Sequence, residues 1–253
     1  MRRLLSVLCC LLFSCALPLQ AEPALRVGYF ELPPHTSAGQ VAGEGLALQY
    51  FERISRQMGV TEVSTSSYPL TRLLYELEEQ RLDMALFLGK TAERETRFIY
   101  AKTPLLVTAA VLALPQQHAL QQIHSIEDLL PLRIGVWSRG YRSPLLRDPR
   151  LKLNELSSHN VVEQSLRMLL AGRFDAFYFP DQLAVRYQLQ RSGQEARIRL
   201  LPLPEPGVAL YSVFNQHSAA IYLQRYEQAL GQVQAQQDYP SFFRERMALS
   251  TPQ

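Results

Sequence analysis

One segment of the chain carries residues suited to binding an acidic group. Residues 81–94, RLDMALFLGKTAER, contain a short apolar run that breaks at Gly89 and is followed by Thr91 and Arg94. Such a run is typical of a buried strand, and polar side chains past the carboxyl end of a strand are where open α/β sheets bind small ligands. A guanidinium binds a carboxylate through paired hydrogen bonds, and a helix start adds free N–H donors. We therefore expect this turn to hold the acidic group of a small solute.

Two short patterns each occur twice. Residues 25–30 (LRVGYF) are echoed at 132–137 (LRIGVW), and residues 81–87 (RLDMALF) are echoed at 173–179 (RFDAFYF). A segment with helical periodicity precedes the second pattern each time. Short matches also arise by chance in a leucine-rich chain, but their common order and context favour two similar α/β units.

The candidate ligand-binding residues end a predicted strand, follow one, or open a helix. They are Tyr29, Phe30, Glu31, Arg72, Gly89, Thr91, Arg94, Trp137, Arg139, Tyr141, Tyr178 and Asp181. Simpler interpretations stay open for several of them. Arg94 and Arg72 can be surface arginines beside acidic neighbours, and Trp137 can be packed in the core as large aromatic side chains usually are.

The histidines and the other acidic residues show no catalytic or metal-binding pattern. No metal-ligand spacing links the histidines, and all are expected on the surface or in loops: His35, His118, His124, His159 and His217. Asp83 and Asp175 begin strands of the repeated pattern, where a structural role is expected. No nucleophile elbow, phosphate-binding loop or zinc-protease motif occurs. We therefore predict no metal, no cofactor and no enzyme, and only Glu31 and Asp181 are candidates for acid–base chemistry.

The first residues have the features of a secretory signal peptide. Two arginines precede an apolar run that ends at Phe13, and the small residue Ala21 suits cleavage. We expect cleavage after Ala21 and export to the periplasm; the alternative is a lipoprotein signal anchored at Cys15. All three cysteines lie in this segment, so the mature chain has no disulfide framework.

The mature chain is expected to be globular and nearly neutral. Its length suits one large domain or two small lobes. Without the two signal-peptide arginines, 24 basic residues face 23 acidic ones, and the net charge of +1 gives no nucleic-acid footprint. No later apolar run reaches the ~20 residues of a transmembrane helix. We expect a monomer.

The order of the predicted elements favours two α/β lobes. Apart from the repeated patterns, strands are predicted at 63–67, 108–114 and 208–214, a polar helix-like segment at 116–122, a long helix from Ala219 and a short one from Pro240. Two crossings between the lobes make a hinge and a cleft. The predicted division is 1–21 signal peptide, 22–109 and 208–253 lobe 1, and 110–207 lobe 2.

This layout resembles family 3 of the bacterial solute-binding proteins, the periplasmic receptors of polar amino-acid ABC transporters. The resemblance runs from about Leu25 to Met247 and rests on LRVGYFELPPH, the glycine-led helix after Gly43, RLDMALFLGKTAER, RIGVWSRGY and LLAGRFDAFYF. It implies a type II periplasmic-binding-protein-like fold. It also implies that Arg94 clamps the α-carboxylate of the ligand.

The chain departs from the family's pattern at several places. Gly89 stands where amino-acid binders usually have a hydroxyl, and Pro180 with Asp181 stands where an aspartate often takes the ligand ammonium. The sequence from Arg139 to Tyr141 replaces the usual Gly-Thr loop. This RGY, and PLTR around Arg72, look more like a divergent subgroup whose members carry P-W-x-R and R-G-Y.

The resemblance implies a periplasmic protein that captures a small polar, carboxylate-bearing solute, an amino acid or a relative, and delivers it to an ABC transporter through an inner-membrane permease. One alternative is a ligand-sensing receptor without a transport role, which signals to a membrane partner. Another is a dehydratase-type enzyme on the same scaffold, which needs an acid or base with a tuned pKa in the cleft.

Overall fold

The computed structural model describes residues 24–37 and 45–250, with the side chains of 249 and 250 excepted. The strands are β1 (Leu25–Tyr29), β2 (Val63–Ser67), β3 (Met84–Gly89), β4 (Ile99–Tyr100), β5 (Leu106–Thr108), β6 (Val111–Pro115), β7 (Arg133–Trp137), β8 (Lys152–Leu156), β9 (Ala176–Phe179), β10 (Ile198–Pro202) and β11 (Val208–Phe214). The helices are α1 (Leu46–Gln57), α2 (Leu70–Glu78), α3 (Ala92–Glu95), α4 (Val161–Leu170), α5 (Gln182–Ser192), α6 (Gln216–Gln236) and α7 (Tyr239–Ser250), with short 3-10 turns at Ile126–Asp128 and Leu145–Arg147.

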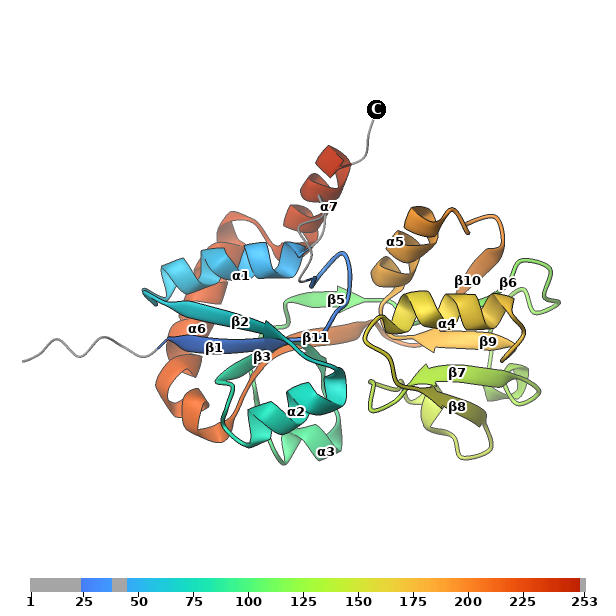
Figure 1. The fold of residues 1–253 in the computed structure, drawn as a ribbon, viewed down its shortest axis with the longest axis horizontal. Coiled ribbons are helices and arrows are strands. Elements are labelled where there is room, and N and C mark those ends of the chain that lie inside the picture. The colour runs from blue at the N-terminus through green and yellow to red at the C-terminus, as the bar shows by residue number, and fades with distance from the viewer. Residues whose placement is uncertain (1–23, 38–44, 251–253) are drawn as a thin grey trace, which may run out of the picture.

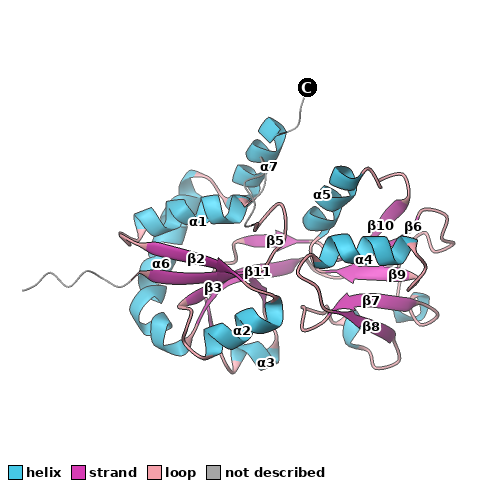
Figure 2. Ribbon diagram, in the orientation of Figure 1, coloured by secondary structure: helices cyan, strands magenta, loops and turns pink. Residues whose placement is uncertain are grey.

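The strands form two separate sheets (Figure 1). The first has the order β2-β1-β3-β11-β4, with β5 also paired to β11, and the second has the order β10-β6-β9-β7-β8. Helices α1 and α2 flank the first sheet on opposite sides, and α4 packs on the second (Figure 2). We call the part built on the first sheet lobe 1 and the part built on the second lobe 2. The fold is therefore α/β with two lobes.

Two short segments join the lobes and lie side by side. One runs between β5 and β6, and the other between β10 and β11. The backbone N–H of Leu203 donates to the carbonyl of Ala110 at 3.1 Å. A Cβ on Gly207 would lie 2.7 Å from Val107 and 3.2 Å from the carbonyl oxygen of Thr108, so this close approach requires glycine. The predicted division at 109/110 and 207/208 remains a prediction, although these segments fall beside it.

The internal repeat is confirmed at the level of strand register. In lobe 1, β1 and β3 are parallel, with Val27 opposite Met84. In lobe 2, β7 and β9 are parallel, with Ile134 opposite Ala176. These four residues occupy matching places in the two repeated patterns. Each lobe thus places the ends of its two central parallel strands at the same edge of its sheet.

The aspartates at the start of the repeated strands have the predicted structural role. Asp83 accepts from the backbone N–H of Arg26 at 2.8 Å and from its guanidinium at 2.7 and 3.0 Å. Asp175 accepts from Arg133 in the same way, at 2.9 Å from the backbone and 2.8 and 3.1 Å from the guanidinium. Each pair ties the first parallel strand of a lobe to the start of its neighbour.

Several predicted elements differ from the structure. The polar segment 116–122 is irregular rather than helical, because Arg199 ties its carbonyls down: the guanidinium donates to His118 and Leu120 at 2.7 Å each. The apolar run 108–114 is divided between β5 and β6, one in each sheet. Helix α6 begins before Ala219, at Gln216, where the Asn215 side chain accepts from the N–H of Ser218.

Two expectations fall outside the described residues. These are the signal peptide, with its cleavage after Ala21 and the alternative at Cys15, and Gly43, which leads into the helix of the resemblance. Among the described residues, no helix has both the length and the apolar character needed to cross a membrane.

Candidate ligand-binding cleft

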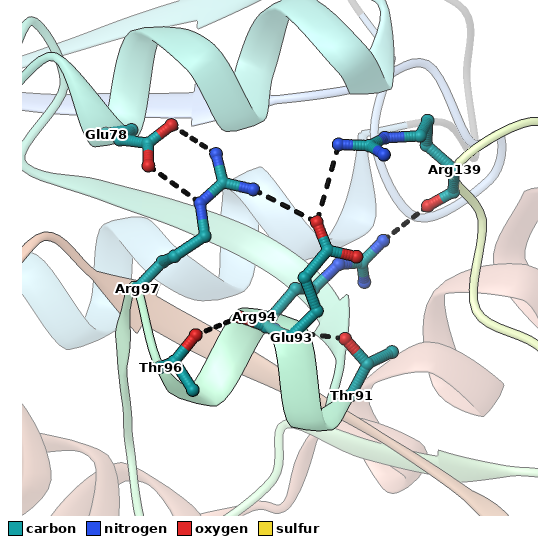
Figure 3. A network of polar contacts seen from close by, with 7 residues as sticks. All are labelled: Glu78, Thr91, Glu93, Arg94, Thr96, Arg97 and Arg139. Atoms are coloured by element: carbon teal, nitrogen blue, oxygen red, sulfur yellow. Dashed lines mark hydrogen bonds and ion pairs between the residues drawn. The ribbon is translucent and has the colours of Figure 1, made fainter.

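Arg94 lies buried between the lobes. It is in the first turn of α3, where the Thr91 hydroxyl accepts from its backbone N–H at 3.2 Å and caps the helix. Its guanidinium donates to the carbonyl of Gly89 at 3.0 Å and, across the cleft, to the carbonyl of Arg139 at 2.6 Å. Figure 3 shows this guanidinium directed at Arg139, whereas Arg97, which follows α3, is directed at Glu78. The predicted strand, turn and arginine therefore meet at the interlobe face.

The charge of Arg94 is not neutralised by a carboxylate. Its side chain is almost fully buried, and within the described residues its hydrogen-bond acceptors are carbonyl oxygens. Burial lowers the pKa of Arg94, although the Tyr100 hydroxyl and Glu93 act in the opposite direction. A buried cation is costly unless it is paired, so this site favours an anion that brings oxygen acceptors of its own.

The space directly beside Arg94 is small. It is a cavity of about 20 Å³ lined mostly by apolar side chains, with Arg94 and Asp181 among the polar ones. A water molecule needs ~10–15 Å³, so this cavity has room for about one. An amino acid enters here only if the lobes or the lining side chains move.

Aromatic rings from both lobes fill the cleft. Phe30, which directly follows β1, and Trp137, which ends the equivalent strand β7, meet edge to face with ring centroids 4.9 Å apart. The Tyr141 ring packs on Gly89 so closely that a Cβ there would lie 2.9 to 3.1 Å from its atoms. The hydroxyl usual in amino-acid binders has no room at Gly89, because Tyr141 covers this position.

Asp181 is held by protein groups. Its Oδ1 accepts from the Thr108 hydroxyl at 2.8 Å and from the N–H of Leu183 at 3.0 Å, which caps α5. Its Oδ2 lies 3.0 Å from Nε2 of His35, an ion-pair distance that lacks the alignment of a hydrogen bond. A role for Asp181 in binding an ammonium remains a prediction, and in this conformation the carboxylate faces His35.

His35 lies in the loop after β1, as expected, but its side chain is not on the surface. The side chain is fully buried, with Nδ1 2.6 Å from the hydroxyl of Tyr239 at the start of α7. Its ring also stacks on Phe243, with centroids 5.0 Å apart. Burial, and the charge of Asp181, raise the pKa of Tyr239 well above its ordinary value, so its hydroxyl stays protonated. A polar chain of Asp181, His35 and Tyr239 thus joins lobe 2 to lobe 1.

The remaining candidates lie around the cleft without lining the small cavity. Glu31 accepts from the Ser67 hydroxyl at 2.9 Å and borders a separate open groove. Arg72 is exposed and pairs with Glu76 within α2. Tyr178 is buried, and its hydroxyl accepts from the N–H of Ser143 at 3.0 Å. The side chain of Tyr29 is also buried. A ligand role for any of these residues remains a prediction.

Two residues with positive φ border the cleft. Phe87 has φ 63° at a bulge in β3, where residues 85–88 face only 211–213 of β11, and Arg139 has φ 60°. Bulky side chains rarely adopt this conformation, and such strain is concentrated at functional sites. The bulge brings the Phe87 ring to His35 and Tyr239, with centroids 5.0 and 5.5 Å away. The apolar pattern of β3 does not reveal the bulge.

No protein-family model and no curated protein matches this sequence. Solved structures do match its fold. The ligand-binding core of GluR0 from Nostoc punctiforme, in complex with L-glutamate, covers 87% of this chain and 98% of its own, at 18% identity and TM-score 0.71. The amino-acid ABC transporter substrate-binding protein AbpA from Streptococcus pneumoniae, bound to L-arginine, covers 91% and 97%, at 16% identity and TM-score 0.74. A histidine kinase sensor domain similar to periplasmic binding proteins covers 90% and 97%, at 16% identity and TM-score 0.73.

The chain therefore has the two-lobed fold of the periplasmic binding proteins. More narrowly, its fold is the one found in the amino-acid substrate-binding proteins of ABC transporters, which the sequence resemblance implied. These similar structures are binding proteins or sensor domains.

Proposed function

We propose that this protein is a periplasmic solute-binding protein that closes its two lobes on a small carboxylate-bearing solute and presents it to an inner-membrane ABC permease. The observation that carries the proposal is the buried guanidinium of Arg94, which bonds only carbonyl oxygens among the described residues. A solute carboxylate would replace the Arg139 carbonyl as acceptor and supply the missing negative charge. Hydrogen bonds between charged groups are about twice as strong as neutral ones, so this exchange favours binding.

Opening of the lobes is part of the proposed mechanism. The cavity beside Arg94 holds about one water, so the solute enters an open form and the lobes close over it. The two adjacent crossing segments are where a hinge of this kind would bend. Solute binding then stabilises the closed form by mass action.

A sensing role is the second candidate, and the matching sensor domain favours it. In that case the closed form would signal to a membrane partner rather than a permease. The enzyme alternative has less support, because Asp181 is held by His35, Thr108 and Leu183, and Glu31 lies on a separate groove.

The test is a thermal-shift screen of amino acids, organic acids and polyamines, followed by calorimetry on the best ligand. We expect carboxylates to raise the melting temperature and polyamines to have no effect. Arg94→Ala should weaken binding ten- to a hundredfold, as expected for one charge-assisted pair worth ~1.5–3 kcal/mol. The matched control is Arg97→Ala, which removes the same charge three residues on but faces Glu78 (Figure 3). Equal affinity of both variants for the ligand would contradict the carboxylate clamp.

A further inference from the structure

A second space beside Arg94 is larger and strongly basic. It is a pocket of about 270 Å³ at the outer end of the cleft, between α3 of lobe 1 and the loop after β7 of lobe 2. We call it the arginine pocket; its polar lining is Thr91, Glu93, Arg94, Arg139, Arg142 and Arg147. Ligand pockets in proteins start at roughly 300 Å³, so this volume suits a small solute, whereas the cavity on the other side of Arg94 does not.

The acids around the arginine pocket do not balance its arginines. Arg142 pairs with Glu155, which lies outside the lining. Glu93 is shared between Arg139 at 3.5 Å and Arg97 at 3.2 Å (Figure 3). The Glu93 carboxylate is therefore shared by two guanidiniums, and of these only the one of Arg139 lines the arginine pocket.

Two guanidiniums of the lining have no carboxylate partner within the described chain. Arg94 donates to carbonyls alone. Arg147 donates through Nε to the carbonyl of Arg142 at 3.0 Å, with its guanidinium 5.8 Å from the centre of the Tyr141 ring. These contacts fix Arg147 without neutralising it, and no ion pair within the described residues reaches either guanidinium.

The two uncompensated charges come from different lobes. Arg94 belongs to lobe 1 and Arg147 to lobe 2, so a group with two negative charges between them would balance both and join the lobes. Guanidiniums suit phosphate and carboxylate oxygens because their N–H donors form a planar fork. A neutral or singly charged solute would leave one cation uncompensated.

We infer that the solute of this protein is a dianion, either a phosphate monoester or a dicarboxylate, and that the arginine pocket balances its two negative charges. This inference rests on the proposed solute-binding function and names its substrate class. One acidic group is held by Arg94, and the remaining charge is held by Arg147 with Arg139 at the mouth of the cleft.

The experiment measures melting temperature and calorimetric affinity with simple probes at constant ionic strength. The probes are inorganic phosphate, glycerol 3-phosphate, succinate and the monocarboxylate butyrate, each against chloride. We expect a dianion to raise the melting temperature by several degrees and to bind at least tenfold more tightly than butyrate. Tighter binding of the two phosphates than of succinate would show that the solute carries a phosphate group. Tighter binding of succinate would show that it is a dicarboxylate.

Arg147→Ala should weaken the dianion at least tenfold and leave butyrate unchanged. Arg150→Ala is the matched control, because this exposed arginine of the same loop pairs with Asp148 and does not line the pocket. Equal dianion affinity in both variants, or no preference for dianions over butyrate, would overturn the inference. If a monocarboxylate still binds in a way that depends on Arg94, the proposed solute-binding function stands even though the dianion inference fails. The experiment therefore distinguishes failure of the inference from failure of the function.

Discussion

The rings of Phe30 and Trp137 meet edge to face across the cleft, with centroids 4.9 Å apart. The two residues occupy the same place in the two repeated patterns: Phe30 directly follows β1, and Trp137 ends β7. The internal repeat therefore joins its own halves through equivalent aromatic side chains. Both rings are largely buried, so separation of the lobes would expose them to water.

Trp137 should report lobe closure by fluorescence, because it is the only tryptophan of the chain. Phe30→Leu keeps an apolar side chain but removes the ring contact, worth ~0.5–1.5 kcal/mol. We expect the emission of the folded variant to shift to longer wavelength and acrylamide to quench it more. Phe51→Leu is the control, because Phe51 is buried in α1 and makes no ring contact with Trp137 among the described residues; it should leave the emission unchanged. Identical spectra for both variants would count against the interlobe contact.

Gly89 should be coupled to Tyr141. Gly89→Ala places a Cβ within 2.9 Å of the ring, and overpacking of this kind costs ~1–3 kcal/mol. In a Tyr141→Ala background the same substitution should cost almost nothing, so a double-mutant cycle in urea should give a coupling energy of similar size. The control is Gly231→Ala in α6, where the added Cβ would meet nothing within 4 Å beyond its own helix and the helix should gain ~0.5–1 kcal/mol. An equal cost of Gly89→Ala in both backgrounds would show that Tyr141 does not cover this position.

Much of the fold can be predicted from the sequence, because strands and turns are specified by residues close together in the chain. The repeated Arg-x-Gly and Arg-x-Asp patterns specify parallel strands whose register matches in both lobes. The turn after β3 is likewise local, since Gly89, Thr91 and Arg94 act within six residues of one another. Hydrophobic periodicity and turn chemistry are sufficient for both.

The side-chain contacts in the cleft cannot be predicted from local sequence patterns, because they join segments that are distant in the sequence. His35 follows two prolines, which indicate a loop, but its burial depends on Tyr239, 204 residues away. The covering of Gly89 by Tyr141 likewise joins two lobes. The side-chain types are visible in the sequence, but which of them meet is set by how the lobes pack.

The two aspartates of the repeat should differ in their contribution to stability. Asp83 is buried and also accepts from the Ser218 hydroxyl at 2.8 Å, whereas the side chain of Asp175 is 34% exposed and has no such partner among the described residues. Asp83→Ala should cost ~3 kcal/mol of unfolding free energy, because it leaves buried donors without an acceptor. Asp175→Ala should cost less than half as much, since exposed ion pairs are screened. Urea denaturation of the two variants side by side measures the difference, and equal costs would contradict this assignment.

The contact of Asp181 with His35 should make stability fall in acid. Burial acts to raise the pKa of Asp181, but the charge of His35 and hydrogen bonds from Thr108 and Leu183 outweigh it, so the pKa lies below its ordinary 3.8. The unfolded chain then binds this proton more readily than the folded one. The stabilisation is therefore complete above the unfolded pKa of about 4 and is lost as the pH falls through the lower folded value.

Asp181→Asn should remove this part of the pH dependence. At pH 7 the variant should lose ~1–3 kcal/mol, because a neutral amide is a weaker acceptor for Thr108 and Leu183 than the carboxylate, and the difference from the unsubstituted protein should shrink as the pH falls below about 4. Urea midpoints between pH 7 and 2 measure it. Thr108→Val removes one hydrogen-bond donor but keeps the carboxylate, so it should lower stability and retain most of the acid dependence. A constant difference between Asp181→Asn and the unsubstituted protein across this range would mean that the carboxylate does not titrate with a lowered pKa.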